Sequence, residues 1–299
     1  MAIVPVLALA IDRAIGEPPT AVHPVVWIGR LLDVAARRRR DDHAASRQIA
    51  GGAAWLALTC ALVVAVAQAV RAGAHRLPPT AATIIEAAVL STLLSERMLV
   101  DEVRATDAAL ARRDLPTARL RLAGLVSRDV TALDATAVRE AAIESAAENL
   151  SDSVVAPLWW YGVGGLPAAA LYRTVNTADA MWGYRWPPWR WWGVAAARLD
   201  DALNWVPARL TALALAPRVG LRRLAVEAGA TASPNAGWPM AAMALRHDLR
   251  LSKPDAYVLH PAGRAARSSD VAAATADVRR VAVTAAAVAA VVPTRDHHR

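Results

Sequence analysis

Residues 49–70 read IAGGAAWLALTCALVVAVAQAV, a run of 22 residues without a charged side chain. As an α-helix this run is about 33 Å long, which matches the roughly 30 Å hydrocarbon core of a bilayer. A second apolar segment, residues 80–95, follows the loop 71–79 and is interrupted only by Glu86. We therefore predict a transmembrane hairpin over residues 49–95. An acid within a membrane segment indicates either a site or a side chain that faces a neighbouring helix.

The composition of the 299-residue chain also favours a membrane protein. Hydrophobic residues make up 56% of the chain, and its formal net charge is +8. A nucleic-acid-binding domain normally offers lysine as well as arginine, and Lys253 is the only lysine here, so we predict no nucleic-acid partner. Cys60 is the only cysteine, which excludes an intramolecular disulfide and a CxxC metal knuckle. Residues 1–11 are apolar but lack a basic region, so they do not resemble a signal peptide.

Arginines flank the predicted hairpin on both sides. Residues 37–40 are four consecutive arginines, and the amphipathic segment 96–128 contains seven more. Such clusters favour the cytoplasmic side of a membrane. We therefore predict a multi-pass protein of the cell (inner) membrane, with loop 71–79 outside. Residues 96–152 form the cytoplasmic helical segment, which begins with a helical hairpin.

The segment after this point becomes apolar again. Residues 154–172 carry no charge but contain Pro157 and Pro167, a pattern typical of a broken intramembrane helix. Eight of the eleven tryptophans lie in residues 159–205, and tryptophan at this density is typical of a bilayer interface. We therefore predict an interfacial site region over residues 153–239, with the active site facing the cytoplasm.

Neither strand-like alternation nor an internal repeat is visible, so we expect helices throughout. Residues 244–270 are polar and rich in loop-forming residues, and the apolar run 281–292 is short for a span. The predicted fold is all-α: a single polytopic, membrane-embedded domain over residues 1–299.

An acidic stripe forms the most unusual polar pattern. Glu140, Glu144, Glu148 and Asp152 follow one another at intervals of four, a spacing that keeps side chains on one slowly winding face of a helix. Acids at this spacing are often simply a solvated face. Glu140 begins the stripe, farthest from the other polar groups, and we expect it to contribute least. Asp134 is the expected N-cap of this helix.

Two pairs of acid and amide side chains follow at a spacing of three residues. They are Asn176 with Asp179 and Asp201 with Asn204, and Asp200 precedes the second pair. Polar residues beside lipid-compatible segments are costly, so their repetition indicates a site. Basic residues are interleaved with them: Arg128, Arg173, Arg185, Arg198 and Arg209. This mixture of oxygen ligands and guanidinium groups is suited to a phosphorylated substrate and a hard cation.

Two turn-rich segments add further candidates. Residues 12–24 contain Asp12, Glu17 and His23, which glycine and proline hold in a turn. Residues 233–239 contain Asn235, which is either part of the turn or a ligand contact.

The ordered set of motifs resembles the CobD/CbiB family of cobalamin biosynthesis, the adenosylcobinamide-phosphate synthases. The motifs are residues 12–29 with Gly-Glu-Pro and His-Pro-Val, Ser127-Arg128-Asp129, residues 144–157, Asn176-Thr177-Ala178-Asp179 with Gly183-Tyr184-Arg185, residues 197–209 and residues 233–239. Together they extend over most of the chain, whereas residues 255–269 match the family loosely. The resemblance implies an integral inner-membrane enzyme. It further implies ATP-dependent amide formation between adenosylcobyric acid and aminopropanol or its phosphate.

Under this resemblance the candidate residues take definite roles. A carboxylate accepts an amine only after activation, for which ATP, Mg²⁺, cationic groups and a base are needed. Glu144 and Glu148 are the candidate bases, and Asp152, Asp179 and Asp201 are the candidate Mg²⁺ ligands. The expected substrate-binding residues are Asp12, Glu17, His23, Arg128, Asp129, Asn149, Arg173, Asn176, Arg185, Arg198, Asp200, Asn204, Arg209 and Asn235. The chain lacks both GxxxxGK[ST] and GxGxxG, so ATP binding follows neither standard fingerprint.

The expected partners are a corrinoid, aminopropanol or its phosphate, and membrane lipid. Self-association and contacts with other cobalamin-pathway enzymes are further expectations. Two other functions remain open from the residues alone. An intramembrane prenyl or alcohol-phosphate transferase also uses short-spaced acids and amides to hold Mg²⁺. A non-catalytic membrane sensor would not need these pairs.

Overall fold

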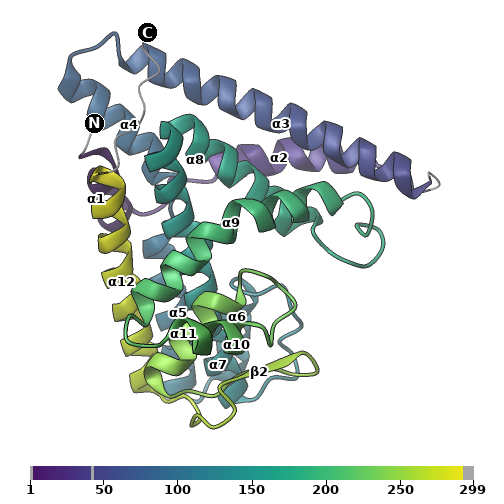
Figure 1. Ribbon diagram of the computed structural model, residues 1–299, viewed down its shortest axis with the longest axis vertical. Helices are drawn as coiled ribbons and strands as arrows, with labels where there is room; N and C mark the ends of the chain where they lie inside the picture. Colours follow the sequence, from purple (N-terminus) through teal and green to yellow (C-terminus); the bar gives the residue numbers. More distant parts are fainter. Residues whose placement is uncertain (1–2, 42–43, 292–299) are drawn as a thin grey trace. The chain divides into compact units, whose positions relative to one another are not determined.

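The computed structural model describes residues 3–41 and 44–291, which are mostly helical (Figure 1). In chain order the helices are α1 (Val4–Ile15), α2 (Pro24–Ala36), α3 (Ala45–Ala74), α4 (Pro79–Ser91), α5 (Glu96–Ala111), α6 (Leu115–Ala123), α7 (Ala135–Leu150), the π-helix η1 (Ser151–Val155), α8 (Ala156–Trp182), α9 (Val194–Leu215), α10 (Leu221–Ala228), α11 (Gly237–His247) and α12 (Ser268–Val291).

A small β-hairpin departs from the expectation of helices throughout. Strands β1 (Leu251–Lys253) and β2 (Tyr257–Leu259) pair antiparallel, with Leu251 opposite Leu259. Each strand has three residues, too few for alternation to be visible in the sequence. The hairpin packs on α7 through β1 and on α11 through β2.

The chain divides into two compact units. Unit 1 contains Met1–Ser95, Ala156–Leu203 and Ala286–Arg299, and unit 2 contains Glu96–Val155 and Asn204–Ala285. The first segment of unit 2 nearly coincides with the predicted segment 96–152. The single membrane-embedded domain stays a prediction.

Helix α3 organises unit 1 by packing against α2, α4 and α8. The core shared by α2, α3 and α8 includes Leu56 and Cys60 of α3, Trp182 of α8 and the nearby Trp192. Gly52 of α3 lies so close to the Trp192 carbonyl that a Cβ at this position would overlap it. Cys60 is buried, as expected of a small core residue.

Among the described residues, two continuous helical segments are long and apolar enough to cross a membrane. They are α3 and the segment Ala135–Trp182, which comprises α7, η1 and α8. Only 22% of the apolar window of α3 is buried, against 61% in the second segment. Leu58, Leu62 and Val66 form an exposed apolar stripe along α3. A core helix of a soluble protein would bury this stripe, so α3 is the stronger candidate span.

The predicted return span is not confirmed. Helix α4 has only 13 residues, about 20 Å of helix, which is shorter than the roughly 30 Å hydrocarbon core. Glu86 is buried on α4, where its Oε1 lies 3.3 Å from Arg71 Nε and its Oε2 accepts a hydrogen bond from the Tyr161 hydroxyl. Glu86 thus faces neighbouring helices, which was one of its two interpretations.

Helix α8 contains the break predicted for residues 154–172. The break lies at Gly164 and Gly165, which have non-helical backbone angles, with φ of +67° at Gly165. Glycine tolerates this left-handed angle because it lacks a Cβ. Pro167 follows the break, near the start of the second helical part, where its missing N–H costs no hydrogen bond.

In unit 2 the structure shows two packed helices in the predicted hairpin segment and confirms the predicted cap. Helices α5 and α6 pack together, and α6 begins after Asp114. The Asp134 carboxylate accepts a hydrogen bond of 2.8 Å from the Ala137 backbone N–H, as expected for the N-cap of α7. Helix α7 packs against α5, α6, α11 and β1.

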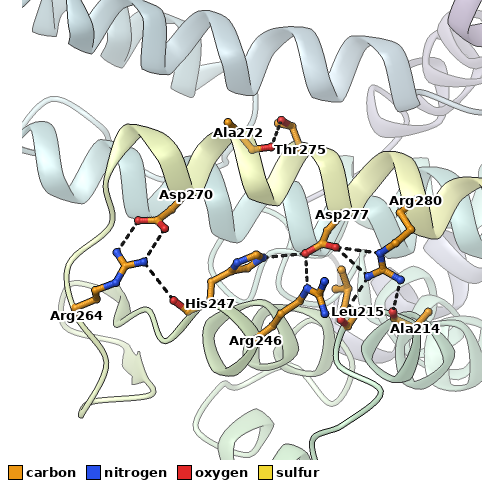
Figure 2. A network of polar contacts seen from close by, with 10 residues as sticks. All are labelled: Ala214, Leu215, Arg246, His247, Arg264, Asp270, Ala272, Thr275, Asp277 and Arg280. Atoms are coloured by element: carbon orange, nitrogen blue, oxygen red, sulfur yellow. Dashed lines mark hydrogen bonds and ion pairs between the residues drawn. The ribbon is translucent and has the colours of Figure 1, made fainter.

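Asp277 of α12 connects three helices in unit 2 (Figure 2). Its carboxylate binds Arg246 Nε at 2.5 Å and His247 Nε2 at 2.8 Å, both from α11. Arg280 binds the same carboxylate at 2.9 Å and donates to the Ala214 carbonyl at the end of α9. Burial opposes ionisation, but the hydrogen bonds from His247, Arg246 and Arg280 outweigh it and lower the pKa of Asp277 to about 2.

We expect Asp277→Asn to lower the free energy of unfolding by roughly 1–3 kcal/mol at neutral pH, because three donors lose their charged acceptor. The ordinary pKa of Asp277 is 3.8 and its folded value is about 2. Its stabilisation is therefore present above about pH 4 and is lost as the pH falls towards 2. Circular dichroism melts in mild detergent measure the difference in stability between variant and wild type. We expect this difference to become smaller as the pH falls from about 4 towards 2. Asp255→Asn, in the turn of the β-hairpin, is the control. A stability difference that does not change with pH would contradict the explanation that the charge of Asp277 stabilises the fold.

Candidate functional site

The acidic stripe of α7 is buried in its first half. Glu140 is 1% exposed and Glu144 is 2% exposed, whereas Glu148 and Asp152 are half-buried. A solvated helix face is therefore the wrong interpretation for Glu140 and Glu144. That Glu140 contributes least to activity stays a prediction.

Arg128 pairs with the middle of the stripe. Its Nη2 donates to Glu144 Oε2 at 2.8 Å; the Glu144 side chain is buried and the Arg128 side chain is partly buried. Glu144 Oε1 and Arg128 Nη1 are also buried, and neither has a hydrogen-bond partner among the described residues. Buried polar atoms are normally paired, so each of these atoms is suited to a polar ligand group.

The β-hairpin supplies two residues to the same place. Ser252 of β1 donates a hydrogen bond of 2.7 Å to Glu140 Oε2. Burial raises the pKa of Tyr257 of β2, and the negative charges of Glu144 and Glu148 raise it further. We call Arg128, Glu140, Glu144, Ser252 and Tyr257 the α7 site.

Sequence reasoning missed Ser252 and Tyr257. An isolated serine and tyrosine in a polar segment carry no distinguishing pattern, and the hairpin that brings them to α7 was not predicted. Two predicted residues in unit 2 make local contacts instead. Asp129 accepts a hydrogen bond from the Thr131 backbone N–H, and Asn149 donates to the Ser145 carbonyl.

A second polar group in unit 2 surrounds Arg209 of α9. Its Nη1 donates to Asn235 Oδ1 at 3.0 Å, so the structure brings together two predicted residues that lie 26 positions apart. The guanidinium lies over the rings of Trp205 and Trp238, at 4.3 and 4.7 Å from their centroids. Asn204 is buried one residue before Trp205.

In unit 1, α8 and α9 bring together three predicted residues. Arg173 Nη1 donates to Asn176 Oδ1 at 3.1 Å, and Asn176 Nδ2 donates to Asp200 Oδ1 at 3.2 Å. Arg173 Nη2 also lies 3.5 Å from the Ser95 hydroxyl. We call Arg173, Asn176 and Asp200 the α8 cluster. It presents a cation, an amide and a carboxylate in one chain of hydrogen bonds.

The N-terminal turn lies near this cluster. His23 caps α2 by accepting a hydrogen bond from the Val25 backbone N–H at 3.2 Å, and its Nε2 lies 3.6 Å from Glu17 Oε2. Burial lowers the pKa of His23; the Glu17 carboxylate opposes this effect and the Arg173 charge adds to it. Asp12, on α1, is 1% exposed.

The other predicted residues of unit 1 lie around the loop between α8 and α9. The Asp179 carboxylate lies directly against the Gly183 Cα, where a Cβ would overlap it. Burial raises the pKa of Asp201, although the exposed Arg198 and Arg185 lie near enough to oppose the shift.

The predicted Mg²⁺ ligands have suitable chemistry, since hard cations bind carboxylate oxygens. They come from both units, Asp152 from unit 2 and Asp179 and Asp201 from unit 1. Within residues 3–41 and 44–291, no group of three or more His, Cys, Asp or Glu side chains is arranged to hold a metal ion. Mg²⁺ usually takes only one or two carboxylates and completes its shell with phosphate and water. The metal site stays a prediction.

Comparison with known proteins identifies the family. The family model described as CobD/Cbib protein matches residues 5–285. The chain is 37% identical over 265 residues to the cobalamin biosynthesis protein CobD of Klebsiella pneumoniae, covering 84% of this chain and 82% of that protein. It is 40% identical over 262 residues to the protein of the same name from Rhodobacter capsulatus, covering 84% and 82%. No solved structure matches. The chain therefore belongs to the CobD/CbiB family of cobalamin biosynthesis proteins.

Proposed function

We propose that the protein is an adenosylcobinamide-phosphate synthase, which joins adenosylcobyric acid to aminopropanol or its phosphate through an amide bond at the expense of ATP. Family membership supports the pathway. The observation that carries the reaction type is the α7 site, where the Glu144–Arg128 ion pair has a buried oxygen and a buried nitrogen without partners.

The reaction has two steps. The corrinoid carboxylate attacks the γ-phosphorus of ATP, the bond to the bridging oxygen breaks, and ADP leaves. The amine nitrogen then attacks the carbonyl carbon of the acyl phosphate. The C–O bond to phosphate breaks, inorganic phosphate leaves, and the nitrogen loses its protons to a base.

Glu144 is the proposed base for the incoming ammonium. Its Oε1 is buried without a protein donor, so it is suited to accept a hydrogen bond from the amine. Arg128 holds the other oxygen at 2.8 Å and fixes the direction of the carboxylate. Glu140, held by Ser252, adds a second negative charge that favours an ammonium over a neutral ligand. Glu148 stays an alternative base.

The α8 cluster is the proposed phosphate-binding region. Arg173 supplies the guanidinium, and the nearby Arg185 and Arg198 supply two exposed ones. Mg²⁺ bound at Asp179 and Asp201 would offset the charge of the ATP phosphates, and Asp152 stays the third predicted ligand. The aromatic and basic segment 183–190 would cap the flat corrin ring.

The proposed location is the cell membrane, with several spans and the site on the cytoplasmic side. In a Cys60→Ala background we expect a membrane-impermeant maleimide to label His75→Cys in intact spheroplasts, because the loop after α3 lies outside. Arg112→Cys is expected to react only after permeabilisation. Both positions are exposed, so burial does not determine the result. The opposite pattern would invert the topology.

An assay of the purified protein in detergent tests the reaction. We expect release of ADP and phosphate only when adenosylcobyric acid, ATP and aminopropanol phosphate or aminopropanol are all present. Mass spectrometry would detect the amide product. Product formation without ATP, or diphosphate release from a polyprenyl diphosphate, would contradict the ligase proposal and favour the alternative transferase function.

A further inference from the structure

A cavity of about 310 Å³ lies beside the first turns of α3 in unit 1. Its lining includes Arg38, Arg40, Arg47, Gln48, Trp55 and Trp192. We call it the Arg–Trp cavity. None of these residues belongs to the α7 site or to the α8 cluster, so the proposed reaction does not explain it.

The cavity is cationic. Asp33 and Asp41, the described acids nearest to it in sequence, are already paired with Arg37 at 2.5 Å and Arg39 at 2.8 Å. Within the described part of the chain, no carboxylate forms an ion pair with the guanidinium of Arg38 or Arg47. Two exposed cations at one cavity attract an anion.

The aromatic side of the cavity is preformed. The Trp192 side chain is held in the core of unit 1, and its ring lies 3.0 Å from the position of a Cβ at Gly51. Arg39 lies over the Trp189 ring, 4.5 Å from its centroid, and so fixes the arginine run beside this segment. The cavity therefore combines a packed apolar wall with exposed cationic side chains.

The position along α3 indicates the source of the anion. The cavity borders residues 47–55, at the start of the uncharged run 49–70. The exposed stripe of Leu58, Leu62 and Val66 begins about one turn beyond Trp55 on the same helix. If this stripe contacts acyl chains, the cavity lies at the depth of the lipid headgroups. A lipid can then place its phosphate between the arginines and its chains along α3, which a soluble phosphate cannot do.

We propose that the Arg–Trp cavity binds the phosphate group of an anionic phospholipid, with Arg38 and Arg47 as the charged contacts and Trp55 and Trp192 as the apolar wall. The inference rests on the membrane location given under the proposed function, but not on the amide-forming reaction.

Native mass spectrometry of the delipidated full-length protein, titrated with phosphatidylglycerol or phosphatidylcholine, tests this site. We expect the double variant Arg38→Gln/Arg47→Gln to bind phosphatidylglycerol about tenfold more weakly than wild type, since each basic residue near an anionic headgroup adds affinity. Arg37→Gln is the matched control, because Arg37 lies in the same run but pairs with Asp33. It is expected to bind like wild type. Phosphatidylcholine should bind weakly and equally to all three proteins.

A third ligand, glycerol 3-phosphate, distinguishes a site for a whole lipid from a site for any soluble phosphate compound. Failure of this soluble compound to displace phosphatidylglycerol supports the lipid site. Displacement at comparable concentrations, or equal binding of phosphatidylglycerol to the double variant and wild type, overturns the proposal. Melting temperatures show whether the variants are folded. The titration contains neither ATP nor corrinoid, so its failure leaves the ligase proposal intact, and failure of the ligase assay leaves this result intact.

Discussion

Glu144→Gln is expected to reduce turnover by roughly 10²–10⁴-fold, the usual contribution of a general base. The amide has the shape of the carboxylate but cannot take a proton from the incoming ammonium. It also removes the negative charge opposite Arg128, 2.8 Å away. A coupled assay of ADP release by the purified variant measures the loss of turnover. The pH dependence of kcat/KM shows whether the decrease of kcat/KM at acidic pH, expected when a base becomes protonated, is absent from the variant.

Glu102→Gln serves as the control for this experiment. Glu102 lies on α5 in the same unit, where it pairs with Arg121 at 3.1 Å and is partly exposed. We expect wild-type turnover from it. Wild-type turnover in Glu144→Gln would exclude Glu144 as the base and leave Glu148 as the candidate. A loss that accompanies a large fall in melting temperature would instead indicate that the buried pair is structural.

Asp179→Asn and Asp201→Asn are each expected to lower turnover by roughly 10²–10³-fold, the size of effect seen when one charge-stabilising group is removed. An amide keeps one oxygen but loses the charge that binds Mg²⁺. We therefore also expect the Mg²⁺ concentration for half-maximal turnover to rise, which a purely structural defect would not change. The same change at Asp152 tests the third proposed ligand.

Asp33→Asn is the control for the metal experiment. Asp33 lies on α2 in unit 1 and pairs with Arg37 on the surface. Its substitution is expected to leave both turnover and the Mg²⁺ dependence unchanged. Unaltered kinetics in all three site variants would mean that these acids have a structural role and do not bind Mg²⁺.

Periodicity and composition predicted much of the helical architecture. The uncharged run 49–70 became most of α3, and Asp134 became the cap of α7, because both signals are local. The break in α8 was predicted from two prolines but occurs at Gly164 and Gly165. Proline at the start of a helical part fits without distortion, whereas a glycine pair adopts angles that other residues avoid.

Burial and long-range contacts were not predictable in the same way. The spacing of Glu140 and Glu144 placed them on one helix face, but the same spacing fits a solvated stripe and a buried one. Which of the two occurs depends on α11 and the β-hairpin, which pack on α7 from more than 80 residues away. Ser252 reaches Glu140 only through that packing.

The sequence alone determined the helical character of the chain, its strongest candidate span and its family, because these depend on local periodicity and on motifs read in order. Tertiary structure alone decided that Glu144 is buried against Arg128, that Asn176 joins Arg173 to Asp200, and that an arginine run borders a tryptophan-lined cavity. Each of these depends on which helices pack together, and no local pattern encodes the distance between side chains that lie far apart in the chain.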